Sequence, residues 1–293
     1  MERLRRYDVV SADGTRLRAW TNDADGPTVL LCNGLGANPY AWPAFLRPGC
    51  GVRVISWNHR GVGGSDRPTD PSRVTVAAFV EDAVAVMDHA GIRSCPVLGW
   101  SFGVNIAFEL AVEHPDRVTG LFAVAGVPGG SFSSMGAPLF IPRFARRPLA
   151  VGLTKVLGRS APVLTPVISR VSIGPTAANL LRYSGLMMPS ADRAVVERAV
   201  GEFLTTPVNW YMHLGREAAR HDPMCLLRLK VPGVFLAGTF DMLASAADMR
   251  KEAKRIPGWR YVEIPGSHSL PIEHPAAVHR ELCAFLVELE AGP

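Results

Sequence analysis

The apolar residues of this chain fall into short unbroken runs separated by turn residues. Polar and apolar positions alternate over residues 5–20 around Asp13-Gly14, which predicts a β-hairpin because Asp-Gly is a preferred hairpin turn. The next two runs, 28–32 and 52–57, are almost wholly apolar and predict buried strands. Over residues 75–90 the apolar side chains recur three and four apart, so a helix is expected there.

Strands and helices continue to alternate further along the chain. A strand at 96–100, a helix at 102–114 and a strand at 118–124 are expected. Strands in which polar and apolar residues do not alternate are buried on both faces, as in a parallel sheet covered by helices on both sides. The fold class is therefore α/β with a mostly parallel sheet. The same rhythm returns near the end, with strands at 234–237 and 261–264 and helices at 245–256 and 275–289.

The rhythm breaks between residues 128 and 226. Prolines are frequent there, and the segments between them favour short helices. We interpret 128–226 as a helical cap inserted over the carboxyl edge of the sheet, where open α/β sheets bind ligands. Residues 1–127 and 227–293 would then form one core domain.

Composition narrows the classes of partner. The net charge is +5, but lysines and arginines form no dense stripe interleaved with aromatics, so no nucleic-acid partner is expected. The five cysteines show no C-x-x-C spacing, and we expect no disulfide framework, no metal and no cofactor. The first residues lack the apolar stretch of a secretory signal, and no apolar run approaches the ~18 residues of a membrane span. A soluble cytoplasmic protein is expected, and its oligomeric state stays open.

The sharpest local motif is Gly99-Trp100-Ser101-Phe102-Gly103. It matches G-x-S-x-G between a predicted strand and a predicted helix, the setting of a nucleophile held on a strained turn. The two glycines let strand and helix approach closely, and the start of the helix favours developing negative charge. Ser101 is the predicted nucleophile.

A serine hydroxyl needs a base and an orienting acid. His268 follows the strand at 261–264 directly and precedes the last helix, so its imidazole can reach a neighbouring strand end. Asp241 ends the strand before that one and is the predicted acid. Asp222 precedes its strand and Asp248 lies inside a helix, so both rank lower.

The remaining site residues are predicted from position. The oxyanion donors are expected to be the backbone N–H groups of Phe102 and of Leu35, in the glycine-rich loop after the strand at 28–32. The substrate pocket is expected to contain one aromatic residue and three methionines, namely Trp100, Met187, Met188 and Met242.

Together these motifs resemble the α/β-hydrolase superfamily, over nearly the whole chain outside the cap. The resemblance implies the α/β-hydrolase fold, and the order Ser101, Asp241, His268 is the order of that family. Members with an aspartate nucleophile include haloalkane dehalogenases and epoxide hydrolases, and Ser101 argues against those chemistries.

Two motifs depart from the usual family pattern. Asn33 stands where a histidine is usual before glycine, and Asn58 stands where an aspartate usually opens the Arg-Gly-x-Gly-x-Ser motif, which fits from Arg60 onwards. The run 33–38 also looks like the loop of intracellular polyhydroxyalkanoate depolymerases.

The leading hypothesis is a serine hydrolase that cleaves carboxylic esters with a hydrophobic acyl group through an acyl-enzyme. A polyhydroxyalkanoate depolymerase, thioesterase, lactonase, acyltransferase or C–C hydrolase could use the same residues. A non-catalytic receptor on a hydrolase fold is the alternative of another class.

The cap has an unusual charge distribution. Residues 118–191 contain no aspartate or glutamate, while seven lysines and arginines lie among many apolar residues. Short amphipathic helices whose basic residues face water would explain this. A lipid-like substrate, with peripheral contact to anionic lipid, is the second interpretation.

Overall fold

The computed structural model describes residues 3–129, 134–135, 141–168, 174–184, 187–221 and 228–291. Eight strands within these ranges form one sheet. The strands are β1 (Arg5–Val10), β2 (Arg16–Thr21), β3 (Thr28–Cys32), β4 (Arg53–Trp57), β5 (Cys95–Trp100), β6 (Val118–Val124), β7 (Gly233–Gly238) and β8 (Arg260–Ile264). The helices are η1 (Pro39–Ala41), α1 (Val76–His89), α2 (Gly103–Glu113), α3 (Arg143–Ile168), α4 (Pro175–Arg182), α5 (Arg193–Phe203), α6 (Val208–Ala218), α7 (Ala246–Ala253), α8 (Leu270–Glu273) and α9 (Pro275–Ala291).

The sheet is antiparallel at one edge and parallel elsewhere. Its strand order is β1-β2-β4-β3-β5-β6-β7-β8. β2 pairs antiparallel with β1 and β4, whereas every pair from β4 to β8 is parallel. The predicted hairpin turn is present, with Gly14 at φ +84°, a conformation that glycine adopts without strain. The expected α/β class and every strand and helix expected in the core are confirmed.

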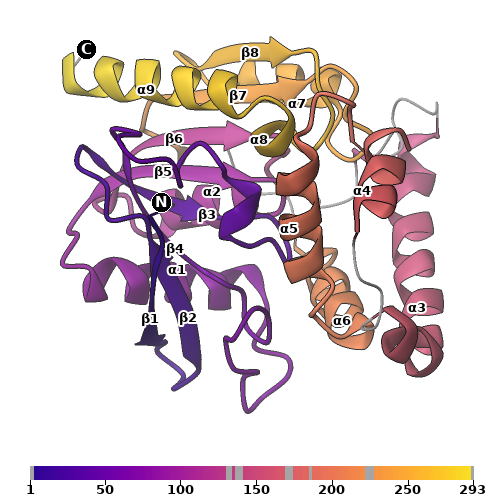
Figure 1. Cartoon of the computed structure of the whole chain (residues 1–293). Helices are drawn as coiled ribbons and strands as arrows, with labels where there is room; N and C mark the ends of the chain where they lie inside the picture. The colour runs from indigo at the N-terminus through magenta and orange to yellow at the C-terminus, as the bar shows by residue number, and fades with distance from the viewer. Residues whose placement is uncertain are drawn as a thin grey trace.

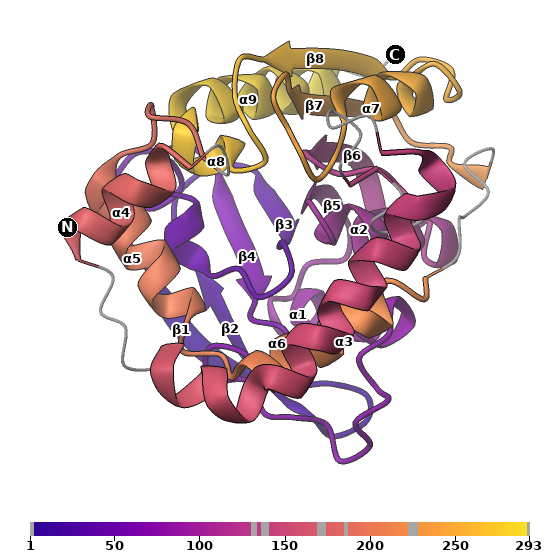
Figure 2. The ribbon, with the colours of Figure 1, turned by 90° about the vertical axis from the view of Figure 1, so that its right-hand side faces the viewer.

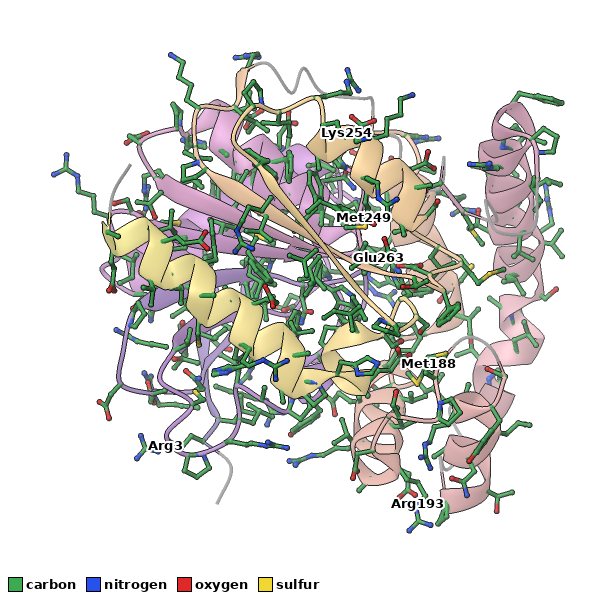
Figure 3. The ribbon with its side chains drawn as sticks, turned by 90° about the horizontal axis from the view of Figure 1, so that it is seen from above. Arg3, Met188, Arg193, Met249, Lys254 and Glu263 are labelled. Atoms are coloured by element: carbon green, nitrogen blue, oxygen red, sulfur yellow. The ribbon has the colours of Figure 1, made fainter. Side chains whose placement is uncertain are left out.

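Apolar side chains fill both faces of the sheet. On one face Phe79 of α1, Phe108 of α2 and Met249 of α7 are fully buried. On the other face Leu282 and Phe285 of α9 belong to a second buried cluster, which also contains Trp42, the residue after η1. Figure 3 shows α9 lying across the sheet on this second face. Burial on both faces explains why the central strands lack alternation.

Four helices, α3 to α6, lie between β6 and β7 in the chain and fall inside the span predicted as a cap. Figures 1 and 2 place them beyond the carboxyl ends of the parallel strands. The expectation of short helices is wrong for α3, which runs for 26 residues although Pro148, Pro162 and Pro166 lie inside it. A proline removes one N–H donor and kinks a helix, but packing can hold the helix together. α3 packs along α6, where Thr154 lies opposite Gly215.

The Arg-Gly-x-Gly-x-Ser loop anchors this insertion to the core. The Arg60 guanidinium is fully buried and donates hydrogen bonds to the Asp82 carboxylate at 2.7 and 2.9 Å. Its backbone carbonyl accepts a hydrogen bond of 2.8 Å from the Trp210 indole of α6. One buried charge pair therefore holds the loop, and the loop in turn holds α6.

None of the helices in the described ranges is long and apolar enough to cross a bilayer.

Candidate active site

Ser101 lies at a strained turn between β5 and α2. Its φ is +57°, a left-handed conformation that is rare for a residue with a side chain. Its backbone N–H donates to the Val124 carbonyl at 2.9 Å, which ties the turn to β6. A Cβ at Gly99 would lie 2.8 Å from the Val104 Cα, and a Cβ at Gly103 would overlap the Cys32 carbonyl. Both motif positions therefore require glycine.

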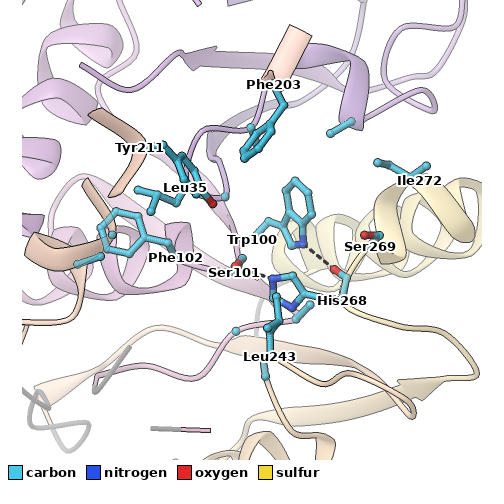
Figure 4. Close-up of a pocket in the computed structure, with 18 of the residues that line it drawn as sticks. Leu35, Trp100, Ser101, Phe102, Phe203, Tyr211, Leu243, His268, Ser269 and Ile272 are labelled. Atoms are coloured by element: carbon cyan, nitrogen blue, oxygen red, sulfur yellow. Dashed lines mark hydrogen bonds between the residues drawn. The ribbon is translucent and has the colours of Figure 1, made fainter. Parts of the chain in front are cut away.

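The structure brings Ser101, His268 and Asp241 together. The Ser101 Oγ lies 2.7 Å from His268 Nε2 (Figure 4). On the other side of the imidazole, His268 Nδ1 lies 2.9 Å from Asp241 Oδ2. When Nδ1–H donates to the carboxylate, Nε2 is left to accept from the serine hydroxyl. The arrangement is that of a nucleophile, a base and an orienting acid.

The Asp241 carboxylate is fixed before it meets the imidazole. Its side chain is fully buried, and Oδ1 accepts hydrogen bonds from the Leu243 and Ala244 amides at 2.7 and 2.8 Å. These two backbone donors fix the orientation of the carboxylate. The other candidate inside the described ranges, Asp248, instead accepts from the Ser134 hydroxyl at 2.7 Å. Asp222 lies outside the described residues.

The loop after β3 presents a backbone amide that donates to no described residue. The Gly34 N–H donates to Asn33 Oδ1 at 3.1 Å, and the Gly36 N–H donates to His59 Nδ1 at 3.4 Å. Between them, the Leu35 N–H donates to none of the described residues, and the same holds for the Phe102 N–H. Leu35 and Phe102 line one cavity with Ser101. Two spare amides beside a nucleophile suit the binding of an oxyanion.

Two buried side chains hold this loop in place. Asn33, where the family usually has histidine, accepts a hydrogen bond of 3.0 Å from the Trp42 indole, which packs edge-on against Trp100. Burial lowers the pKa of His59 to about 4, so its imidazole is neutral at pH 7 and can accept from Gly36. No motif in the sequence indicates this use of His59.

A cavity of about 390 Å³ opens over Ser101. Its floor is the carboxyl edge of the sheet, and its roof comes from the inserted helices. Of the predicted pocket residues, Trp100 and Met187 line it. Helical spacing alone does not tell which face of α5 or α6 meets the cavity, so their lining residues were not predicted from the sequence. The largest of these are Phe203, Tyr211 and Met212.

Met188 and Met242 do not line the cavity, which corrects their assignment to the pocket. The Met188 N–H donates to Glu273 Oε1 at 2.9 Å, which fixes this segment against α8. Beside Met242, the turn closed by Asp241 directs Leu243 and Ala244 into the cavity instead. In both cases a backbone hydrogen bond sets which residue of the segment faces the substrate space.

Glu273 is a support for the site that sequence reasoning missed. Its buried carboxylate accepts from the Ser267 amide at 2.7 Å and from the Ser267 hydroxyl. It also accepts from the Met188 amide, so one side chain joins the loop of His268 to the inserted segment. The Trp100 indole donates to the His268 carbonyl at 3.1 Å and holds the same loop from the other side.

Among the described residues, no group of histidine, cysteine and carboxylate side chains is arranged to hold a metal ion. Several polar side chains line the cavity, that of Tyr211 among them. The groups of the nucleophilic centre are the Ser101 hydroxyl, the His268 imidazole and the two spare backbone amides. These groups suit nucleophilic attack on a carbonyl carbon.

Comparison with solved structures supports the fold. An esterase from Exiguobacterium antarcticum superposes with a TM-score of 0.74 at 16% identity, covering 96% of this chain and 99% of its own. The enol-lactonase from Burkholderia xenovorans gives a TM-score of 0.70 at 24% identity, covering 96% of this chain and 100% of its own.

Comparison of sequences identifies the family. Epoxide hydrolase A of Mycobacterium tuberculosis is 25% identical over 96% of this chain and 97% of its own length. The putative carbamate hydrolase RutD of Caulobacter vibrioides is 34% identical over 42% of this chain and 46% of its own length. A family model described as alpha/beta hydrolase fold matches residues 27–275. This chain belongs to the α/β-hydrolase fold family.

Proposed function

We propose that this protein is a serine hydrolase that cleaves carboxylic esters with a hydrophobic acyl group. The observation that carries the proposal is the continuous hydrogen-bonded chain from Ser101 Oγ through His268 to Asp241, at 2.7 and 2.9 Å. Nucleophile and base lie within the reach that proton transfer requires. A serine activated in this way attacks acyl carbons.

In the acylation half of the reaction, the Ser101 Oγ attacks the ester carbonyl carbon while His268 Nε2 takes the hydroxyl proton. The Leu35 and Phe102 amides hold the carbonyl oxygen as it becomes negative. The C–O bond to the alcohol breaks, and the proton on Nε2 passes to the leaving alkoxide. Asp241 stabilises the imidazolium that exists between these two transfers.

Deacylation repeats the same proton movements with water. His268 Nε2 takes a proton from the water molecule, whose oxygen attacks the acyl carbon. The Ser101 Oγ then leaves and recovers its proton from the imidazolium. The products are an alcohol and a carboxylic acid, and no redox partner is needed.

The lining of the cavity supports a hydrophobic acyl group. Met187, Phe203, Met212 and Ile272 all face it. Transfer of each methylene from water to such a lining contributes about 0.8 kcal/mol. Thioethers adapt to acyl chains of different shape. We therefore expect binding to strengthen as the acyl chain lengthens.

Epoxide hydrolysis is the activity named for several relatives. The resemblance set out above associates that chemistry with an aspartate nucleophile, whereas this chain has Ser101 in the corresponding turn. Thioesters, lactones, carbamates and C–C bonds remain within reach of an activated serine. A substrate panel that includes them tests the choice of an ester.

The proposal is tested by labelling and turnover together. A fluorophosphonate probe should label the wild type, and kcat/KM on p-nitrophenyl esters should rise from acetyl to octanoyl. The Ser101→Ala variant should remain folded, lose the label and lose at least ~10³-fold in kcat.

Three results would contradict the proposal. A folded protein that neither labels nor turns over any ester would be a binding protein. Wild-type activity in the folded Ser101→Ala variant would exclude Ser101 as the nucleophile. An acetyl ester as the best substrate would exclude the hydrophobic acyl group.

A further inference from the structure

Exposed apolar side chains gather at one end of the molecule. Ten large apolar residues of the described ranges are exposed, and only Val10 on β1 and Val287 on α9 lie away from the carboxyl end of the sheet. The other eight lie on α3, on α4 with the residue after it, or in the loop after β7, and they are Phe144, Leu149, Leu153, Val156, Leu180, Tyr183, Phe240 and Leu243. A gathering of this kind marks a surface that meets an apolar partner.

The outer face of α3 carries the most regular part of this surface. Leu149, Leu153 and Val156 are 59%, 51% and 59% exposed. They follow one another at i, i+4 and i+7 and therefore form one stripe along the helix. The opposite face of α3 is covered, because Thr154 and Gly158 pack on α6. Figures 1 and 3 show α3 at the outer edge of the molecule.

Positive charge flanks the stripe. Lys155 and Arg159 are exposed, and neither forms an ion pair with a described residue. The chain has no acidic residue between positions 118 and 191 to neutralise them. The outer side of α3 is therefore both apolar and basic.

We propose that α3 docks this protein on an anionic lipid bilayer, with the helix lying in the plane of the interface. Its apolar stripe enters the boundary between head groups and acyl chains, while Lys155 and Arg159 meet the lipid phosphates. The Thr154 side of α3 lines the cavity over Ser101, so docking brings that cavity beside the bilayer. Docking itself does not depend on the proposed ester hydrolysis.

The charges favour lipid over the other possible occupants of this surface. A symmetric dimer would bring the basic flank of one copy against that of the other, which is repulsive. A nucleic acid would match the charges but would leave the exposed leucines in water. An anionic bilayer satisfies both the charge and the apolar stripe.

The test is sedimentation of the full chain with vesicles. The wild type should bind vesicles of phosphatidylcholine with phosphatidylglycerol, bind pure phosphatidylcholine more weakly, and dissociate as salt is raised. Joint replacement Lys155→Glu and Arg159→Glu should weaken binding to the anionic vesicles at least about tenfold. Joint replacement Leu149→Ser, Leu153→Ser and Val156→Ser should abolish it.

Matched controls distinguish binding through the α3 surface from binding through any exposed apolar side chain. Val10→Ser with Val287→Ser removes two equally exposed residues elsewhere and should bind as the wild type does. Ser101→Ala should also bind, so docking and catalysis can fail independently. Unchanged melting temperatures would show that each variant is folded.

Two outcomes would overturn the proposal. One is a wild type that fails to bind anionic vesicles, or a stripe variant that binds them as tightly as the wild type does. The other is a dimer in analytical ultracentrifugation that the stripe variant converts to monomer. That second result would assign the surface to a second copy of this chain.

Discussion

At the scale of single residues, backbone strain is concentrated beside the nucleophile. Two of the three described non-glycine residues with positive φ line the cavity, namely Ser101 at +57° and Ala125 at +45°. Such conformations cost on the order of 1–3 kcal/mol and persist where neighbours determine them. The Ala125 amide donates to the Leu236 carbonyl at 2.9 Å, so strand pairing holds this turn as it holds that of Ser101.

The first prediction at this scale concerns Asp241, the proposed acid of the triad. Asp241→Asn keeps the shape of the side chain but presents an amide to His268 Nδ1, which favours the wrong imidazole tautomer. We expect kcat on an octanoyl ester to fall by ~10⁴-fold. Asp248→Asn is the control, because that carboxylate hydrogen-bonds Ser134 and not His268. Equal losses in the two variants would remove Asp241 from the proposed mechanism.

The second prediction at this scale concerns the hydroxyl group of Tyr211. Burial raises the pKa of its phenol to about 12, so it is a neutral donor at pH 7. Its hydroxyl lies in the cavity (Figure 4) and bonds to no described residue. Tyr211→Phe should lower kcat/KM by about three- to tenfold on esters whose alcohol carries a hydrogen-bond acceptor.

The matched control for Tyr211 lies on the surface. Tyr183 is 70% exposed, and Tyr183→Phe should leave the kinetics unchanged. Fluorophosphonate labelling of Tyr211→Phe should persist, since the serine and its base are untouched. An unchanged kcat/KM on every ester would show that the Tyr211 hydroxyl does not meet the substrate.

At the scale of elements, the loop between β8 and α8 depends on α8 for its position. The carboxylate of Glu273 on α8 accepts hydrogen bonds from the Ser267 and Met188 amides, and His268 lies next to Ser267 in the chain. Glu273→Gln replaces a charged acceptor with a neutral one at nearly constant volume. Hydrogen bonds to charged groups contribute about 1.5–3 kcal/mol, so the loop should lose part of its order.

The kinetics of Glu273→Gln should show that it positions His268 without touching substrate. We expect kcat to fall about tenfold while KM for a short ester stays within about twofold. Amide hydrogen exchange should rise in the loop around His268 and near Met188, and not in α2. A fall in melting temperature with wild-type kcat would assign Glu273 to stability alone.

At the scale of the whole molecule, buried His59 makes folding depend on pH. Burial lowers its folded-state pKa from 6.5 to about 4. Between these values the unfolded chain binds a proton that the folded chain does not, so stability rises with pH across this window. The stabilisation is complete above pH 6.5 and is lost as pH falls toward 4, by up to about 3 kcal/mol.

Urea denaturation at a series of pH values measures this dependence. His59→Asn keeps an acceptor for the Gly36 amide but cannot titrate. The difference in unfolding free energy between wild type and variant should therefore shrink or reverse as pH falls from 6.5 to 4, and stay constant above 7. A constant difference over the whole range would show that the pKa of His59 is the same in the folded and the unfolded protein.

The sequence alone determined the core elements and the three residues of the proposed triad. Strand burial and helix spacing are local patterns, and the Gly99 to Gly103 turn needs only its own residues and the strand it follows. Chain order then placed Asp241 and His268 at the ends of neighbouring parallel strands, because such strands end at one edge of the sheet.

The tertiary structure decided what depends on contacts between distant segments. Met187, and not Met188, faces the cavity because Glu273, which lies 85 positions beyond Met188 in the chain, fixes the Met188 amide. α3 continues past its prolines because α6 packs along it, which no propensity of α3 itself indicates. Periodicity tells that a helix has two faces, but only the packed neighbours decide which face meets the substrate and which remains exposed.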